Sequence, residues 1–519
     1  MDIKKRLMDS SYDGLWALFL IIILSTAALL LLKITSLPSL AENFQADSYD
    51  TILSIRLLSE YGPFADIPLY PGPYSLFGNF PLLFAYLGSA INLVIGDVSL
   101  SATLLYWAIE IGIAALLWFG VLKTSDWRVR TALVVLFLVN ISFGNLFPLG
   151  FRKRQQLAIL IGLCMFLSRN RYLNGALAFA AMSAQPITGA AIIFLKGADL
   201  LQGRDYPALA ILIGALALSM PLYSGLLSST TLEPAMSGCG IMTLQNAAGI
   251  TMLLSLAFLL FFISNRGRLD ALSASSAALA LFYPLALVSY VLIKDIAPLE
   301  MARGFLLVFS TPCNESVLEV SALGIAVLAG LRGFTMPRAT IVLIAVASII
   351  SLSLLATFIV AGQSMKQNAE GILSLLDKQN ASRIKTMELV MTNHSGRMDT
   401  MPLFPFFWLQ SYAMLNGRNV TFVGEYNLPP QLSKGGSNVP MSRIPLAIYD
   451  SDADSCRKDV AEIKSSGAQV LLYLVDFDFT AIPERGRFSN ETVLDGCGLK
   501  VISADVQGNG GAVLIYRVQ

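Results

Sequence analysis

The chain has 519 residues, of which 55% are hydrophobic and only 14% charged, and its mean hydropathy is +0.64. Soluble domains average about 25% charged residues, so these values exclude a soluble protein. Lysine and arginine (36 residues) nearly balance aspartate and glutamate (35), and a net charge of +1 gives no attraction to nucleic acid as a partner.

Long apolar runs fill residues 14–362. A bilayer core about 30 Å thick needs roughly 20 apolar residues per helix, so we predict a polytopic α-helical membrane protein. The expected spans number about 11, with an upper count of 13; they lie near 14–36, 99–122, 131–149, 155–168, 172–184, 187–200, 207–227, 243–263, 271–293, 303–331 and 339–362. The first run is expected to be an uncleaved span.

The basic loops set the orientation of these spans. Lysine and arginine near span ends favour the cytoplasmic side, and one arrangement puts nearly all of them there: Lys4, Lys5, Arg6, Lys123, Arg128, Arg130, Arg169, Arg171, Lys196, Arg204, Arg266, Arg268, Arg332 and Arg338. We therefore expect a multi-pass protein of the plasma membrane with a cytoplasmic N-terminus. The C-terminal tail is then extracytoplasmic.

The first outer loop, residues 37–98, contains two segments that we expect to lie along the membrane surface. Residues 46–62 have an amphipathic pattern that ends in Gly62, which is typical of a helix with a glycine cap. Asp47 and Asp50 are three positions apart and share one face of its first turn. We expect the second segment, 80–96, to lie at the outer membrane interface. If it crossed the membrane, every later loop would lie on the opposite side.

The two carboxylates of this loop have two interpretations. Neighbouring carboxylates at a boundary of low dielectric constant tend to have a raised pKa, which suits a general base that takes a proton from a hydroxyl or amide. Alternatively, both acids cap the helix and match its dipole without any chemical role.

One basic sequence suits a lipid phosphate. Arg152, Lys153 and Arg154 lie on the side expected to be outside, against the positive-inside rule. Cations at the membrane surface bind an anionic headgroup and stabilise a departing phosphate. The alternative is an ordinary cytoplasmic loop at 152–154.

Two further polar residues lie at or inside spans. Gln185 precedes Pro186 at an outer turn and is a supporting candidate, although a simple helix-breaking turn explains it as well. Glu110 lies inside the span at 99–122, and an acid there is costly to bury. We interpret Glu110 as a hydrogen-bonding group between helices.

The five cysteines and the single histidine, His394, show no metal-ligand spacing. We therefore expect no zinc or iron site and assign no cofactor, and a role for a divalent cation is left open. Cys456 and Cys497 both lie in the tail, where an oxidising outer location would allow a disulfide. Two free thiols are the alternative.

The composition changes after Gly362, so we divide the chain into a membrane module, 1–362, and a soluble α/β domain, 363–519. The patterns at 444–449, 456–465 and 470–475 predict a strand, a helix and a strand. A further apolar strand is expected at 511–516.

The first outer loop carries a resemblance to a known family. Arg56 lies nine positions after Asp47, and Gly62 lies fifteen positions after Asp47. An aromatic-Pro-Leu sequence at 80–82 opens the second segment. This pattern resembles the GT-C glycosyltransferases, in the branch that uses polyprenyl- or dolichyl-phosphate sugars. Many relatives have Asp-Glu where this chain has Asp47-Ser48, so the resemblance does not decide whether Asp47 or Asp50 is the base.

The resemblance implies a GT-C-like fold and the transfer of a sugar from a polyprenyl-phosphate donor to a glycan, lipid or protein acceptor on the outer face. It implies that Asp47 lies near the acceptor and activates it, with Arg56 and Gln185 in support. Arg303 lies in a later outer segment, and an arginine at this place is associated in the family with the donor phosphate. The alternative is an interfacial, snorkelling arginine. Membrane lipid is the other expected partner.

Other classes of protein share some of these features. An oligosaccharyltransferase would carry a Trp-Trp-Asp signature in the tail, which this sequence lacks. A polytopic transporter would have similar helices and buried polar groups, but the sequence has no repeated halves. A non-catalytic membrane scaffold that displays an outer domain is the third class.

Overall fold

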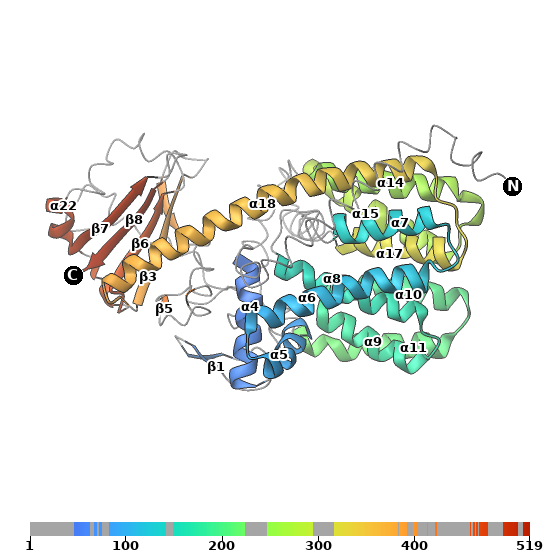
Figure 1. Ribbon diagram of the computed structural model, residues 1–519, viewed down its shortest axis with the longest axis horizontal. Coiled ribbons are helices and arrows are strands. Elements are labelled where there is room, and N and C mark those ends of the chain that lie inside the picture. The colour runs from blue at the N-terminus through green and yellow to red at the C-terminus, as the bar shows by residue number, and fades with distance from the viewer. Residues whose placement is uncertain are drawn as a thin grey trace. The chain divides into compact units, whose positions relative to one another are not determined.

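A computed structural model gives the fold (Figure 1). It describes residues 46–62, 67–69, 72–74, 83–141, 149–223, 247–293, 316–381, 383–391, 398–401, 413, 421–422, 457, 460–461, 463–465, 467–475, 491–506 and 512–519. The chain divides into two compact units, one of Met1–Glu60 and Phe80–Gln363 and one of Tyr61–Asn79 and Ser364–Gln519.

The described part of the first unit is helical. Its elements are α4 (Ala46–Tyr61), α5 (Leu83–Ile95), α6 (Val98–Ala115), η1 (Leu116–Val121), α7 (Trp127–Val135), η2 (Leu136–Ile141), α8 (Leu149–Leu167), α9 (Arg171–Ala184), α10 (Pro186–Gln202), α11 (Tyr206–Ser219), η3 (Met220–Tyr223), α14 (Ala247–Ser264), η4 (Arg266–Arg268), α15 (Ala271–Ile293) and α17 (Ser316–Leu331). Helix α18 (Arg338–Lys378) begins in the first unit and ends in the second.

These helices fall close to most of the predicted spans, and α15 coincides with the span at 271–293. Three boundaries differ. The segment predicted at 131–149 is the helix from Trp127 to Ile141, α8 already begins at Leu149, and α17 begins at Ser316 within the predicted 303–331. The first predicted span, 14–36, lies outside the described residues.

The number of membrane crossings stays a prediction. Within the described part of the chain, one helix, Val98–Val121 with 24 residues, is long and apolar enough to cross a membrane. Shorter apolar helices of 10–17 residues accompany it.

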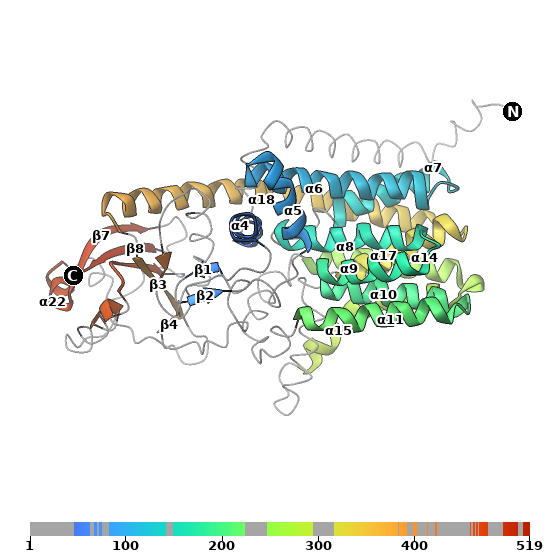
Figure 2. The same cartoon turned by 90° about the horizontal axis from the view of Figure 1, so that it is seen from below.

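Helix α17 is the core of the first unit. Every residue from Val317 to Gly330 is buried, because α8, α10, α14 and α15 pack around it. Small residues allow this close approach: Ser321 Oγ donates to the carbonyl oxygen of Ser276 at 2.8 Å, and a Cβ on Gly324 would lie 2.9 Å from the Cβ of Ser276. Figures 1 and 2 show the long helices of this unit side by side.

The axis of helix α4 runs across the axes of these long helices instead of along them. It is seen from the side in Figure 1 and end-on in Figure 2, where the bundle helices are seen from the side. Helix α5 packs on it closely: a Cβ on Gly88 would lie 2.5 Å from Cδ1 of Ile55, and the hydroxyls of Ser59 and Ser89 are 3.0 Å apart. A helix across the bundle has the orientation expected of an interfacial helix.

The second unit contains a mixed sheet in the order β4-β3-β6-β8-β7, with β5 paired to β3. Its strands are β3 (Arg383–Met391), β4 (Met398–Met401), β5 (Thr421–Phe422), β6 (Val470–Val475), β7 (Leu499–Val506) and β8 (Ala512–Val518), and the helix α22 (Glu491–Cys497) packs on β7. The predicted strand at 470–475 is confirmed as β6, which pairs parallel to β3 and antiparallel to β8. A separate hairpin joins β1 (Ile67–Leu69) to β2 (Gly72–Tyr74).

Candidate functional site

The two ends of the helical unit differ in composition. At one end, here called the α4 end, α5 packs on α4 and also contacts α8 and α9. At the other, the basic end, η1, α8, α10 and α17 finish. Leu167 contacts Gly120 there, and Gly330 lies against the backbone of Val121 and Leu122. Among the described residues, those predicted to carry chemistry belong to the α4 end.

Helix α4 carries both candidate bases. It begins at Ala46, so Asp47 and Asp50 lie in its first turn, as predicted; their side chains are outside the described part. Gly62 follows the helix with a φ of +86°, a conformation that favours glycine. The predicted glycine cap is therefore confirmed.

Arg56, two turns after Asp47, forms an ion pair within α4. Its Nε donates to Oε1 of Glu60 at 2.7 Å, and both side chains are partly exposed. The two residues are four positions apart, so their side chains lie one helical turn apart on the same face. Arg56 is thus held on the surface of α4, and a supporting role in chemistry stays a prediction.

The first turns of α8 contain the basic sequence. Arg152 and Lys153 are helical, and their side chains are not described. Arg154, Gln155 and Gln156 follow with 3%, 2% and 0% of their surface exposed. Taking a cation and two amides out of water side by side costs desolvation free energy that their polar contacts must offset.

Gln185 has a clear local role. Its side-chain Oε1 accepts from the backbone N–H of Thr188 at 2.7 Å and so caps α10. The turn from α9 to α10 is tight, because a Cβ on Gly189 would lie 2.7 Å from the backbone nitrogen of Met182. Capping explains a polar residue before Pro186 without any contact to substrate.

Sequence reasoning missed Glu319. This acid is buried in α17, one turn before Leu323, whose Cδ2 would touch a Cβ placed on Gly162 of α8. Residues four apart share a helix face, so Glu319 lies on the side of α17 that faces α8. A charge inside an otherwise apolar helix was the available signal. Arg303 lies outside the described residues.

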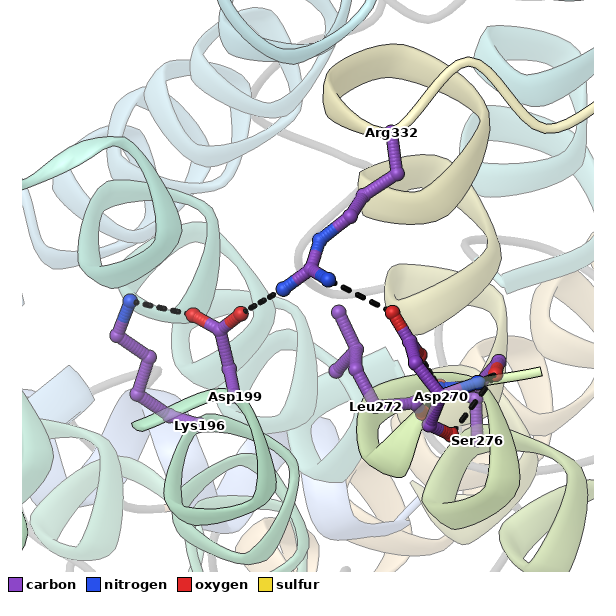
Figure 3. Close-up of polar contacts among 7 residues, drawn as sticks. Lys196, Asp199, Asp270, Leu272, Ser276 and Arg332 are labelled. Carbon is purple, nitrogen blue, oxygen red and sulfur yellow. Dashed lines mark hydrogen bonds and ion pairs between the residues drawn. The ribbon is translucent and has the colours of Figure 1, made fainter. Parts of the chain in front are cut away.

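The basic end is held by an ion-pair network (Figure 3). Arg332, just after α17, donates to Asp199 Oδ1 at 2.6 Å and to Asp270 Oδ2 at 2.7 Å, and Lys196 pairs with Asp199 Oδ2 at 3.2 Å. These four residues tie α10, α15 and α17 together.

Asp270 also caps α15. Its Oδ1 accepts from the backbone N–H of Ser273 at 2.8 Å. Burial alone would raise the pKa of Asp270, but the hydrogen bonds from Ser273 and the charge of Arg332 outweigh it and hold the pKa below its ordinary value.

Two further expectations concern metal ions and disulfides. Among the described residues, no three His, Cys, Asp or Glu side chains gather closely enough to hold a metal ion. Cys497 is disulfide-bonded in the structure, and Cys456, its predicted partner, lies outside the described residues.

Comparison with known proteins gives matches only at the level of structure. No family model and no curated protein sequence matches the chain. The structure is similar to the arabinofuranosyltransferase AftD from Mycobacteria, with 16% identity and a TM-score of 0.46, over 96% of this chain and 40% of that one. It is also similar to ArnT from Cupriavidus metallidurans in the apo state, with 12% identity and a TM-score of 0.39, over 95% of this chain and 97% of that one.

The first of these neighbours is, by its name, a glycosyltransferase. The chain spans less than half the length of AftD. Because both TM-scores lie below 0.5, the likenesses transfer no residue role to this chain.

Proposed function

We propose that this protein is a membrane glycosyltransferase of the GT-C type. It moves a sugar from a polyprenyl-phosphate donor to a glycan, lipid or protein acceptor on the outer, extracytoplasmic face of the plasma membrane. The observation that carries the proposal is α4: a helix lying across the bundle, with Asp47 and Asp50 in its first turn and Gly62 at its end. Asp47 and Gly62, together with Arg56 between them, carry the family resemblance of the sequence.

The proposed reaction needs one base and one set of cations. Asp47, or Asp50 in its place, takes the proton of the acceptor hydroxyl or amide as that group attacks the sugar carbon. The bond from this carbon to the phosphate oxygen breaks, and the electron pair leaves with the polyprenyl phosphate. Arg152, Lys153, Arg154 and Arg303 hold the departing phosphate. Inversion at the sugar carbon is what the family resemblance implies.

Burial at the start of α8 supports the phosphate-binding part of this proposal. A buried arginine beside two buried glutamines offers several hydrogen-bond donors in a region with little competing water. Such donors suit a phosphate that enters from the membrane on its lipid tail. A transporter or scaffold would not require an acidic helix at the same end of the bundle.

Asparagine variants of the two candidate bases test the proposal. Membranes that contain wild-type, Asp47→Asn or Asp50→Asn protein are incubated with a panel of radiolabelled polyprenyl-phosphate pentoses and hexoses, and label transferred to lipid and glycan is measured. We expect the variant that lacks the base to lose about 10²–10⁴-fold in transfer rate. The other variant should keep most of its transfer rate. The comparison of the two rates therefore identifies which aspartate is the base.

Asp495→Asn is the matched control, because Asp495 is an exposed carboxylate in the second unit, outside the proposed machinery. It should transfer label like the wild type, at an equal level of membrane-inserted protein. Wild-type rates in both Asp47→Asn and Asp50→Asn protein would overturn the assignment of the base. Absence of transfer by wild-type protein from every donor of the panel would overturn the enzyme class.

A further inference from the structure

Three helices that start at the basic end share a short local sequence. Each has an aspartate or asparagine N-cap, an aromatic side chain within its first two residues and an adjacent arginine. In α7 these are Asp126, Trp127 and Arg128, in α9 Asn170, Tyr172 and Arg171, and in α11 Asp205, Tyr206 and Arg204. We call these triplets the start motifs.

The aromatic side chains of the start motifs point away from the core. Trp127, Tyr172 and Tyr206 are 54%, 66% and 61% exposed. Large aromatic residues exposed at the ends of apolar helices are typical of the boundary between membrane and water, where the ring meets the acyl chains and the polar group meets the headgroups. Leu173 and Leu201 are exposed beside them.

Three arginines at this end carry charge without a described carboxylate beside them: Arg171 and Arg204 of the start motifs, and Arg169, which directly precedes Asn170. Among the described residues, no carboxylate lies within ion-pair distance of Arg169, Arg171 or Arg204, and all three are exposed. Arg171 stacks on the ring of Tyr172, with 5.1 Å from Cζ to the ring centroid. Lys196 and Arg332, by contrast, are occupied by Asp199 and Asp270 in the ion-pair network.

The pattern is absent from the two helices whose N-caps are described at the α4 end. The N-caps described at the α4 end are Asp97 for α6 and Gln185 for α10, and they are followed by Val98 and Pro186. Neither helix has an aromatic side chain or an arginine in its first two residues. Helix capping alone therefore does not explain the start motifs.

We propose that the start motifs form a docking surface for the anionic phospholipid headgroups of the leaflet at the basic end. Guanidinium groups bind phosphate oxygens through two parallel N–H donors. Aromatic rings on three helices set the depth at which the arginines meet the phosphates. The surface lies on the side that the basic loops predict to be cytoplasmic, and its role does not depend on the proposed sugar transfer.

The test compares lipids that differ only in headgroup charge. The full chain is purified in a nonionic detergent, and its thermal unfolding is followed during titration with phosphatidylglycerol or with phosphatidylcholine of identical acyl chains. We expect phosphatidylglycerol to raise the melting temperature more than phosphatidylcholine, and added salt to reduce the difference. In Arg169→Gln/Arg171→Gln/Arg204→Gln protein, the affinity for phosphatidylglycerol should fall roughly fivefold per arginine, or roughly a hundredfold in all.

The control carries the same loss of charge elsewhere. Lys378→Gln/Lys464→Gln/Lys500→Gln removes three exposed lysines of the second unit and should keep the wild-type response to phosphatidylglycerol. Equal stabilisation of wild-type protein by the two lipids would overturn the proposal, and this comparison needs no variant to fold. An equal loss in the lysine control, or an equal shift with inorganic phosphate alone, would also overturn it.

Discussion

The two ends of the helical unit place arginine side chains in different environments. At the basic end, Arg332 stands between Asp199 and Asp270 at ion-pair distance, and each acid comes from a different helix. At the α4 end, Arg154 is almost fully buried beside two glutamines. A partly exposed ion pair loses little hydration free energy on folding. A fully buried cation loses a large amount of hydration free energy, which its surroundings must offset.

This difference separates architecture from function. The basic end is explained by capping, ion pairs and close backbone contacts, each of which stabilises the neighbouring helices. The start of α8 instead buries a cation and two amides side by side. Because buried charge inside a membrane bundle is costly, the proposed function places the chemistry at the α4 end.

Breaking the backbone contact at the basic end should have the largest effect on folding. A Cβ on Gly330 would lie 2.7 Å from the carbonyl carbon of Val121 and 3.2 Å from Cα of Leu122, and a backbone neighbour cannot rotate away. We expect Gly330→Ala to destabilise the protein by about 1–3 kcal/mol or more, seen as a lower melting temperature in detergent.

Gly214→Ala is the control for this substitution, because nothing lies within 4 Å of a Cβ at that position in α11. Alanine is the better helix former, so Gly214→Ala should leave the melting temperature unchanged or raise it. Equal melting temperatures of the two variants would contradict the contact at Gly330.

Removal of the buried cation tests the α4 end. Charge-assisted hydrogen bonds contribute about 1.5–3 kcal/mol, so Arg154→Gln should weaken the binding of a polyprenyl monophosphate roughly tenfold to a hundredfold. Binding is measured on purified, folded protein by titration. Arg266→Gln, an exposed arginine at the basic end, should bind like the wild type. Unchanged affinity in a folded Arg154→Gln variant would remove Arg154 from the phosphate site.

The smallest expected effect concerns Asp270 and its dependence on pH. The pKa of Asp270 is held below its ordinary value of 3.8, so its stabilising contribution is complete above that value and is lost as the pH falls through the lower, folded pKa. Asp270→Asn keeps the helix cap but loses the ion pair with Arg332. It should be less stable than wild type by about 0.2–1 kcal/mol at neutral pH.

The measurement is the melting temperature of both proteins between neutral pH and the acid limit of folding. The difference should narrow in acid, where the wild-type carboxyl is protonated as well. Asp495→Asn serves as a reference for an exposed carboxylate outside any network. A difference between wild type and Asp270→Asn that stays constant with pH would show that the charge of Asp270 is not responsible.

Much of the helical architecture could be predicted from the sequence, because local signals mark the helix ends. Asn170 caps α9, and Pro186 opens α10 at the place predicted from its fixed backbone angle. Gly62 ends α4 in the left-handed conformation that its position predicted. These features depend on neighbours along the chain.

Other features depend on residues far apart in the sequence. The start of α8 was placed too late, because hydropathy disfavours Arg154 and Gln155 inside a helix although the fold buries them. The ion pairs of Arg332 join residues 62 and 133 positions away, and no local pattern predicts such partners. Glu319 had a local signal, a charge inside an apolar helix, but its burial depends on the helices packed around α17.

The aromatic side chains at the basic end have a geometrical consequence. Trp127, Tyr172 and Tyr206 begin three different helices, and three points that do not lie on one line define a plane. Anchors at the membrane surface set helix tilt as well as depth. In the proposed docking to lipid headgroups, the three rings set the tilt of the bundle within the bilayer, and this tilt sets the height of Asp47 and Asp50 of α4 relative to the opposite membrane surface.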